Sequence, residues 1–211
     1  MNNITAKIFG INRHRIQLDG DGIRSLVFFS GCTLRCKYCI NPQSWDNSRV
    51  PHEYSIEQLY DTLSVDNLYF QATNGGITFG GGEPLLQAKF IHAFIDYAPQ
   101  TWNYWVETSL AVPYENIKLV SNQISRFIVD IKTLDPQIYR QYTGAEASLA
   151  YNNLLRLIAD IGTEKIIVCA PFIPNYTTKE QQEEAHRHLL DIGITNIEMF
   201  DYVVRNKLTR S

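Results

Sequence analysis

The sequence predicts an α/β protein, a partial (β/α)6 TIM-like barrel with parallel strands. Six short apolar runs alternate with amphipathic helical patterns, and this alternation is typical of repeated β-α units around a parallel sheet. No low-complexity linker or exact repeat divides the 211 residues, a length that suits one such barrel. We therefore expect a single domain over residues 1–211.

The expected strands are apolar runs that end in polar or turn-forming residues. They lie at 23–31, 75–84, 103–109, 126–134, 165–174 and 196–204. The second breaks into a glycine loop, and the fifth is ended by prolines.

Helical periodicity fills most of the intervals between these runs. It predicts helices over 55–66, 85–98, 148–162 and 177–193. Ser55 can cap the first of them, because Gln58 follows three residues later and completes the spacing of a capping box. Gly162 and Gly193 are expected to end the last two.

In sheets of this kind the chemistry lies beyond the carboxyl ends of the strands. The residues expected there are Cys32 to Cys39, Gly81, Gly82, Glu83, Glu107, Thr108, Asp130, Lys132, the prolines at 171–174, Asp201 and Tyr202. We therefore expect one polar site at this rim, with the cysteine-containing loop at its edge.

Three of the four cysteines, Cys32, Cys36 and Cys39, fall within eight positions, while Cys169 is far along the chain in an apolar strand. Three thiols cannot all be paired as disulfides. A structural zinc site normally takes four protein ligands, and an iron–sulfur cluster usually takes four thiolates. Three thiolates would leave one iron open to bind something else. The spacing alone leaves zinc and a cluster both open.

The formal net charge is −3, which gives no reason to expect nucleic acid or an anionic membrane as a partner. The first residues, MNNITAKIFG, lack the apolar core of a signal peptide, and no apolar run approaches about 18 residues. We expect a cytoplasmic protein, because close-set cysteines there more often bind metal or do redox chemistry than form disulfides.

The motif CTLRCKYC (32–39) resembles the CxxxCxxC signature of radical S-adenosylmethionine enzymes. The similarity extends to both sides. The segment DGDGIRSLVFFSGC (19–32) resembles the lead-in of glycyl-radical-enzyme activating enzymes of the pyruvate formate-lyase activating type. GGITFGGGEPLLQ (75–87) and VDIKTLD (129–135) resemble their glycine-rich and Asp-x-Lys segments. The resemblance covers nearly the whole chain.

This resemblance implies a function. Cys32, Cys36 and Cys39 would hold a 4Fe-4S cluster and leave one iron for S-adenosyl-L-methionine. Reductive cleavage would give a 5′-deoxyadenosyl radical that abstracts hydrogen from a glycine of a partner glycyl radical enzyme. Flavodoxin or ferredoxin would supply the electron.

The resemblance also implies roles for single residues. Gly81, Gly82 and Glu83 would bind the methionine amino group, although these glycines could merely form a tight turn. Tyr38 would pack on adenine, or belong to the core.

Glu107 and Thr108 would lie near the cofactor. Asp130 and Lys132 would help to hold the cofactor or substrate, or form a simple ion pair at a strand end. Asp19 and Arg24 would lie near a peptide substrate.

Two positions depart from the family pattern. Ser109–Leu110 replaces the usual Asn-Gly, and Cys169 stands where many relatives carry an arginine that contacts the cofactor carboxylate, unless Lys132 or Lys165 substitutes for it. Two alternatives remain open: a radical S-adenosylmethionine enzyme that modifies a small molecule or peptide, and a non-catalytic metal-binding module.

Overall fold

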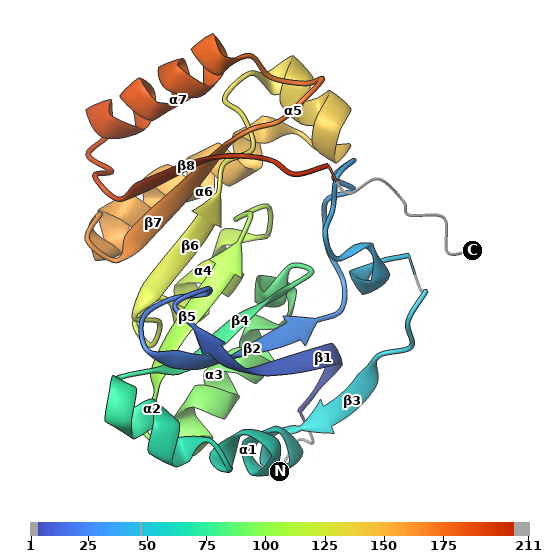
Figure 1. The fold of residues 1–211 in the computed structure, drawn as a ribbon, viewed down its shortest axis with the longest axis vertical. Coiled ribbons are helices and arrows are strands. Elements are labelled where there is room, and N and C mark those ends of the chain that lie inside the picture. Colours follow the sequence, from blue (N-terminus) through green and yellow to red (C-terminus); the bar gives the residue numbers. More distant parts are fainter. Residues whose placement is uncertain (1–3, 47, 205–211) are drawn as a thin grey trace.

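A computed structural model describes residues 4–46 and 48–204 (Figure 1). Among these residues the strands form one eight-stranded sheet in the order β3-β1-β2-β4-β5-β6-β7-β8. The strands are β1 (Thr5–Ile16), β2 (Ile23–Phe29), β3 (His52–Ser55), β4 (Gly76–Gly81), β5 (Asn103–Thr108), β6 (Arg126–Asp130), β7 (Ile166–Phe172) and β8 (Ile197–Asp201).

The prediction of six parallel strands is confirmed by β2 and β4 to β8, which pair in parallel and in chain order. Each new strand therefore adds to the same edge of the sheet, as in a barrel. Within the described part of the chain, β8 pairs only with β7 and β3 only with β1, so the barrel is partial, as expected.

The two strands that the sequence did not predict are antiparallel. β1 pairs with β2, with Ile11 opposite Val27, and β3 pairs with β1. The second half of β1 is polar and mostly exposed, so it lacks the apolar run that marks the other strands. Register shifts on β1, between Ile8 and Gly10 and between Asn12 and Arg15, interrupt its alternation further.

The helices are α1 (Ile56–Ser64), α2 (Asn67–Thr73), α3 (Ala88–Tyr97), α4 (Tyr114–Val120), α5 (Pro136–Thr143), α6 (Ala147–Ile161) and α7 (Lys179–Asp191), with short 3₁₀ turns η1 (Pro42–Ser44) and η2 (Pro84–Gln87). The predicted capping box at α1 is confirmed, because the Ser55 hydroxyl accepts from the Gln58 N–H at 3.2 Å and the Gln58 side chain accepts from the Ser55 N–H at 2.9 Å. The sequence missed α2, α4 and α5, each only seven or eight residues long.

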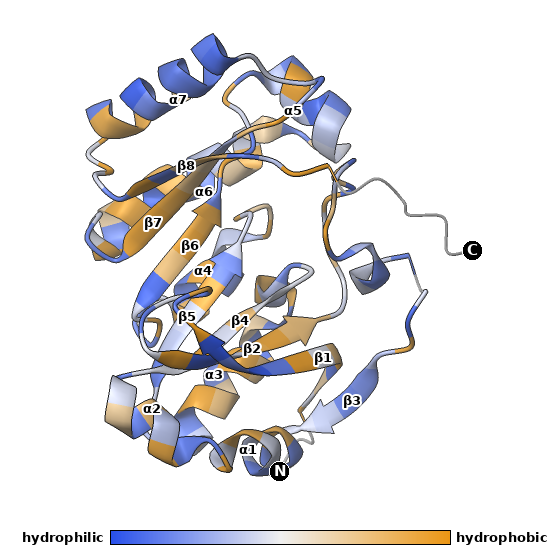
Figure 2. Cartoon of the chain, viewed as in Figure 1, coloured by the Kyte–Doolittle hydropathy of each residue, from blue (hydrophilic) through white to orange (hydrophobic). Residues whose placement is uncertain are grey.

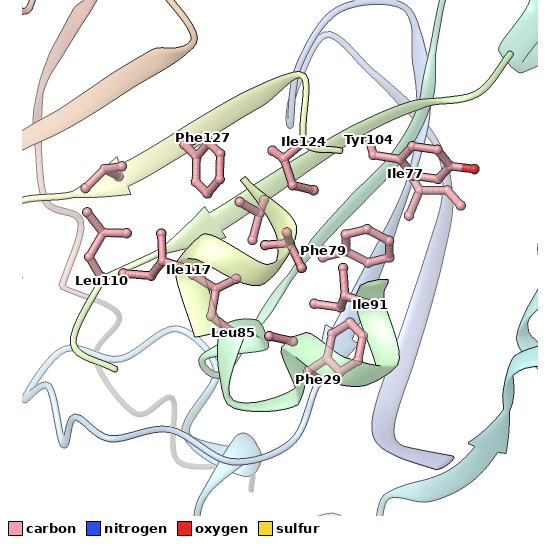
Figure 3. Packing of buried hydrophobic residues seen from close by; sticks show 14 of the residues in the cluster. Phe29, Ile77, Phe79, Leu85, Ile91, Tyr104, Leu110, Ile117, Ile124 and Phe127 are labelled. Atoms are coloured by element: carbon pink, nitrogen blue, oxygen red, sulfur yellow. The ribbon is translucent and has the colours of Figure 1, made fainter. Parts of the chain in front are cut away.

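The main core lies between the sheet and the helices that cover it (Figure 3). Phe79 on β4 meets Phe94 on α3 with ring centroids 6.1 Å apart, and Phe29 on β2 meets Phe90 at 6.2 Å. Burying each such side chain stabilises the fold by about 1.5–3 kcal/mol. Figure 2 shows the hydrophobic residues concentrated on the strands, while the outer side of α7 is hydrophilic. No helix among residues 4–46 and 48–204 is both long enough and apolar enough to cross a membrane.

Candidate active site

The cysteine-containing loop follows β2 and is anchored on both sides. Towards β4, the Glu83 N–H donates to the Gly31 carbonyl at 2.8 Å. Towards α5, the Arg35 N–H donates to the Thr143 carbonyl at 2.7 Å and the Lys37 N–H to the Tyr142 carbonyl at 3.1 Å. The backbone of the loop is thus held between two elements far apart in the sequence.

The expected convergence at the rim is observed as one cavity at the carboxyl ends of the parallel strands. Its lining consists of Cys32, Leu34, Cys36, Cys39, Ile40, Asn41, Ser44, Gly81, Gly82, Glu107, Thr108, Ser109, Asp130, Lys132 and Tyr202. Of the residues expected to hold the cluster or the cofactor, Tyr38 and Glu83 are not in this lining.

The three loop thiols are free, as is that of Cys169. Burial raises the pKa of Cys32 to about 12 and that of Cys36 to about 11, so both are protonated near neutral pH unless a metal takes the place of the proton. In the described part of the chain no three His, Cys, Asp or Glu side chains converge on a single ion. Thiolates that each bind a different iron of a cluster need not converge in this way.

The two lining glycines are required by close backbone packing. A Cβ on Gly82 would lie 2.1 Å from the Gly31 carbonyl oxygen. Gly81 has φ of +98°, and a Cβ there would lie 2.7 Å from the Cα of Phe28. The loop geometry therefore needs both glycines, and it leaves their backbone facing the cavity.

The structure places the Glu83 carboxylate behind the cavity wall, at 1% exposure. It accepts hydrogen bonds from the Thr108 hydroxyl at 2.7 Å, from the Ser109 hydroxyl at 2.7 Å, from the Ser109 N–H at 2.9 Å and from the Leu85 N–H at 3.3 Å. Burial raises the pKa of Glu83, and these donors oppose the shift. This carboxylate joins the loops after β4 and β5.

Asp130 and Lys132 form the ion pair considered from the sequence, with Nζ donating to Oδ2 at 2.7 Å. Burial by itself would lower the pKa of Lys132, but Asp130 holds it well above its ordinary value, so the lysine stays charged. Lys132 is the only lysine or arginine in the cavity lining of the described chain. Lys165 precedes the first residue of β7 and so lies at the end of the sheet away from the rim.

Glu107 contributes a second carboxyl group to the cavity lining, in addition to that of Asp130. Burial raises its pKa to about 8, and the nearby charges of Asp19 and Asp130 add to the effect. Its Oε2 would lie 2.7 Å from a Cβ at Gly80, so Gly80 leaves the space that this side chain fills.

Tyr38, on the cysteine loop, belongs to an aromatic cluster. Its ring centroid is 6.0 Å from Tyr142, 5.7 Å from Tyr176 and 6.5 Å from Tyr202, and its hydroxyl accepts from Asn175 Nδ2 at 3.1 Å. The aromatic side chain in the cavity lining is that of Tyr202. Tyr38 thus lies outside the cavity lining but packs against Tyr202, which is part of it.

Three further expected residues lie outside the cavity lining. Arg24 is fully buried at the amino end of β2, where it donates to Thr78 Oγ1 at 2.8 Å, so its expected place near a peptide substrate is wrong. Asp19 is also buried and pairs with Arg15. The exposed Asp201 pairs with Lys179.

Cys169 is buried on β7, as expected from its apolar strand, beside Asp130 in the sheet register and with Sγ 3.8 Å from Glu198 Oε2. The Cys169 thiol is therefore next to two carboxylates.

Sequence reasoning missed Asn41 and Ser44, which complete the cavity wall. The Asn41 side chain donates to the Gly81 carbonyl at 3.1 Å and so ties the cysteine loop to the glycine loop. The sequence offered one signal for this role, because the polar Asn41 stands only two positions after Cys39, the last cysteine of the loop.

Comparison with protein families shows that residues 18–132 match the 4Fe-4S single cluster domain. The pyruvate formate-lyase-activating enzyme of Clostridium pasteurianum is 30% identical over 86% of this chain and 74% of that protein. The pyruvate formate-lyase 2-activating enzyme of Escherichia coli is 26% identical over 93% of this chain and 77% of that protein. The (2S)-3-sulfopropanediol dehydratase activating enzyme of Klebsiella oxytoca is 27% identical over 80% and 71%.

Solved structures share the fold at low sequence identity. Streptococcus suis SuiB bound to S-adenosylmethionine aligns with a TM-score of 0.62 and 14% identity over 82% of this chain and 38% of that one. Native anSMEcpe with bound AdoMet aligns with a TM-score of 0.60 and 16% identity over 86% and 53%. The chain thus spans about two-fifths to half of these two larger proteins.

Proposed function

The chain belongs to the pyruvate formate-lyase-activating enzyme family of radical S-adenosylmethionine proteins, and on that premise we propose that it activates a partner glycyl radical enzyme. When bound, a reduced 4Fe-4S cluster and S-adenosyl-L-methionine supply the 5′-deoxyadenosyl radical that abstracts hydrogen from a glycine. The single observation that supports this function best is the cavity itself, because it unites three thiols, two backbone-exposing glycines and one buried lysine.

Different residues of the cavity would bind different parts of the two cofactors. Cys32, Cys36 and Cys39 hold the cluster, and the backbone at Gly81 and Gly82 is open to the methionine amino group. Lys132 offers a cation to the methionine carboxylate.

Other residues shape and support the cavity. Thr108 and Glu107 form its wall, and Tyr202, backed by Tyr38, offers an aromatic face to adenine. Glu83 acts from behind the wall by holding Thr108 in place.

Three further assignments follow as proposals. A flavodoxin or ferredoxin supplies the electron, since the cluster must be reduced once per cleavage. The cytoplasm is the compartment, which four free cysteines support. The chain is one domain, since all described strands join one sheet.

The test is reductive cleavage of S-adenosylmethionine. The protein is reconstituted anaerobically with iron and sulfide, reduced with dithionite and given the cofactor, and 5′-deoxyadenosine is measured by mass spectrometry. We expect product from the wild type and none from Cys36→Ala. Cys169→Ala is the matched control, and it should keep the wild-type iron content because Cys169 lies outside the cavity lining. Bound zinc without a cluster would contradict the proposal.

A further inference from the structure

The loop segment 36–40 borders two hollows. Cys36, Cys39 and Ile40 line the inner cavity described above, and the same three residues line a neighbouring recess. The recess lining consists of Arg35, Cys36, Lys37, Tyr38, Cys39, Ile40, Pro42, Gln43, Trp45, Asp46 and Val203. In Figure 1 this loop, in blue, comes close to the short red segment that directly follows β8. Two of the three loop cysteines thus border both hollows.

The recess is basic at its edge, in a chain whose net charge is −3. Arg35 and Lys37 are exposed, and neither forms a salt bridge within residues 4–46 and 48–204. The Arg35 guanidinium lies 4.9 Å from the centre of the Trp45 ring. Asp46 is the one acidic residue in this lining.

Apolar side chains complete the recess. Ile40 is 58% exposed and Val203 is 76% exposed, values high for large hydrophobic residues. Exposed apolar side chains next to cations without a salt-bridge partner are typical of a surface that binds an acidic protein.

We propose that this recess is the docking site of an acidic one-electron carrier protein of the flavodoxin or ferredoxin class. The inference rests on the proposed function, because it needs a cluster on the three thiols. The reduced carrier gives up one electron and is oxidised by one electron. A cluster held by Cys32, Cys36 and Cys39 would accept that electron, and no atom would be transferred.

The different linings of the two hollows favour an electron carrier over the glycine-bearing substrate at this surface. Hydrogen abstraction requires atoms to meet in the inner cavity, and the recess lining includes neither Gly81 nor Lys132. Electron transfer needs no such contact between reacting atoms.

Two variants test the recess at separate positions. Lys37→Glu reverses a charge on a side chain with no hydrogen bond from its amino group among the described residues, and Gln43→Glu adds a negative charge to the same lining. Lys118→Glu on α4 reverses an exposed charge outside the recess and is the matched control. Cluster reduction by reduced flavodoxin is followed by absorbance, and carrier binding by calorimetry.

At low ionic strength we expect both recess variants to slow reduction by subsaturating flavodoxin by about fivefold to tenfold and to weaken its binding. The difference should shrink as salt is added, and Lys118→Glu should match the wild type. Reduction by dithionite should be equal in all four proteins, since it needs no docking.

Equal flavodoxin kinetics and binding in all four proteins would overturn the docking site, even with normal cleavage under dithionite. A slower glycine activation by Lys37→Glu under dithionite, with flavodoxin binding unchanged, would assign the recess to the substrate enzyme and also overturn it. Loss of cleavage by the wild type under dithionite would instead contradict the proposed function.

Discussion

Ser109 donates both its N–H, at 2.9 Å, and its hydroxyl, at 2.7 Å, to one oxygen of the Glu83 carboxylate. The second oxygen accepts from Thr108. Ser109, which departs from the motif expected at this point of the sequence, thus has a defined partner in the structure. The two loops that carry these residues form adjacent parts of the cavity wall.

Ser109→Ala should destabilise the protein by about 1.5–3 kcal/mol, because the variant loses the hydrogen bond from the Ser109 hydroxyl to the buried carboxyl group of Glu83. Urea denaturation of the apoprotein measures the change. Ser148→Ala, at an exposed position of α6, is the control and should change stability by less than about 0.5 kcal/mol. Equal values for the two variants would show that the Glu83 contact contributes nothing.

Glu107 should make the stability of the apoprotein depend on pH. Its pKa rises from 4.5 to about 8 on folding, mainly through burial, so between these values the folded state binds more protons than the unfolded state. Stability therefore falls as pH rises through this window. Glu107→Gln should be more stable than the wild type at pH 8 by about 2–4 kcal/mol and nearly equal to it at pH 4.5.

The measurement for Glu107 is urea denaturation across this pH range, with Glu115→Gln as an exposed control on α4. A wild type and Glu107→Gln variant with parallel pH profiles would contradict the prediction.

Lys132→Met should weaken S-adenosylmethionine binding to the reconstituted protein by about tenfold to a hundredfold, because it removes the cation from the described cavity lining. Calorimetry measures the affinity. Lys165→Met is the matched control, and its affinity should stay at the wild-type value because Lys165 lies at the far end of β7. If the control loses affinity and Lys132→Met does not, the carboxylate is held elsewhere.

Gly20→Ala should destabilise the protein by about 2–4 kcal/mol, because φ is +126° and the new Cβ would lie 2.6 Å from the Trp105 ring. Gly144→Ala is the comparison. It also has positive φ, +75°, but its nearest neighbour would be 3.9 Å away, so only the backbone cost of about 1–2 kcal/mol applies. The ratio of the two unfolding free-energy changes decides whether the segment around Gly20 is packed on Trp105 as described.

The parallel strands could be predicted because each is an apolar run bounded by turn residues, and the capping box at Ser55 because it is a local pattern. The polar half of β1 gave no such signal, and helices of seven or eight residues are too short for periodicity to identify.

The direction of the site side chains was harder to predict. Glu83 turns behind the wall because donors from β5 surround it, and Tyr38 joins tyrosines from three other segments. Both depend on contacts between distant parts of the chain, which local sequence does not encode. Arg24 is a further example, since a charged residue in the lead-in motif is fully buried at the amino end of β2.

Electron paramagnetic resonance of the partner tests the central claim most directly. The reconstituted protein, S-adenosylmethionine, dithionite and a purified glycyl radical enzyme from the same genome are mixed anaerobically and frozen. The account predicts the doublet signal of a glycyl radical with the wild type, and no such signal with Cys36→Ala. Cleavage of S-adenosylmethionine by the wild type without a glycyl radical in any such partner would contradict it.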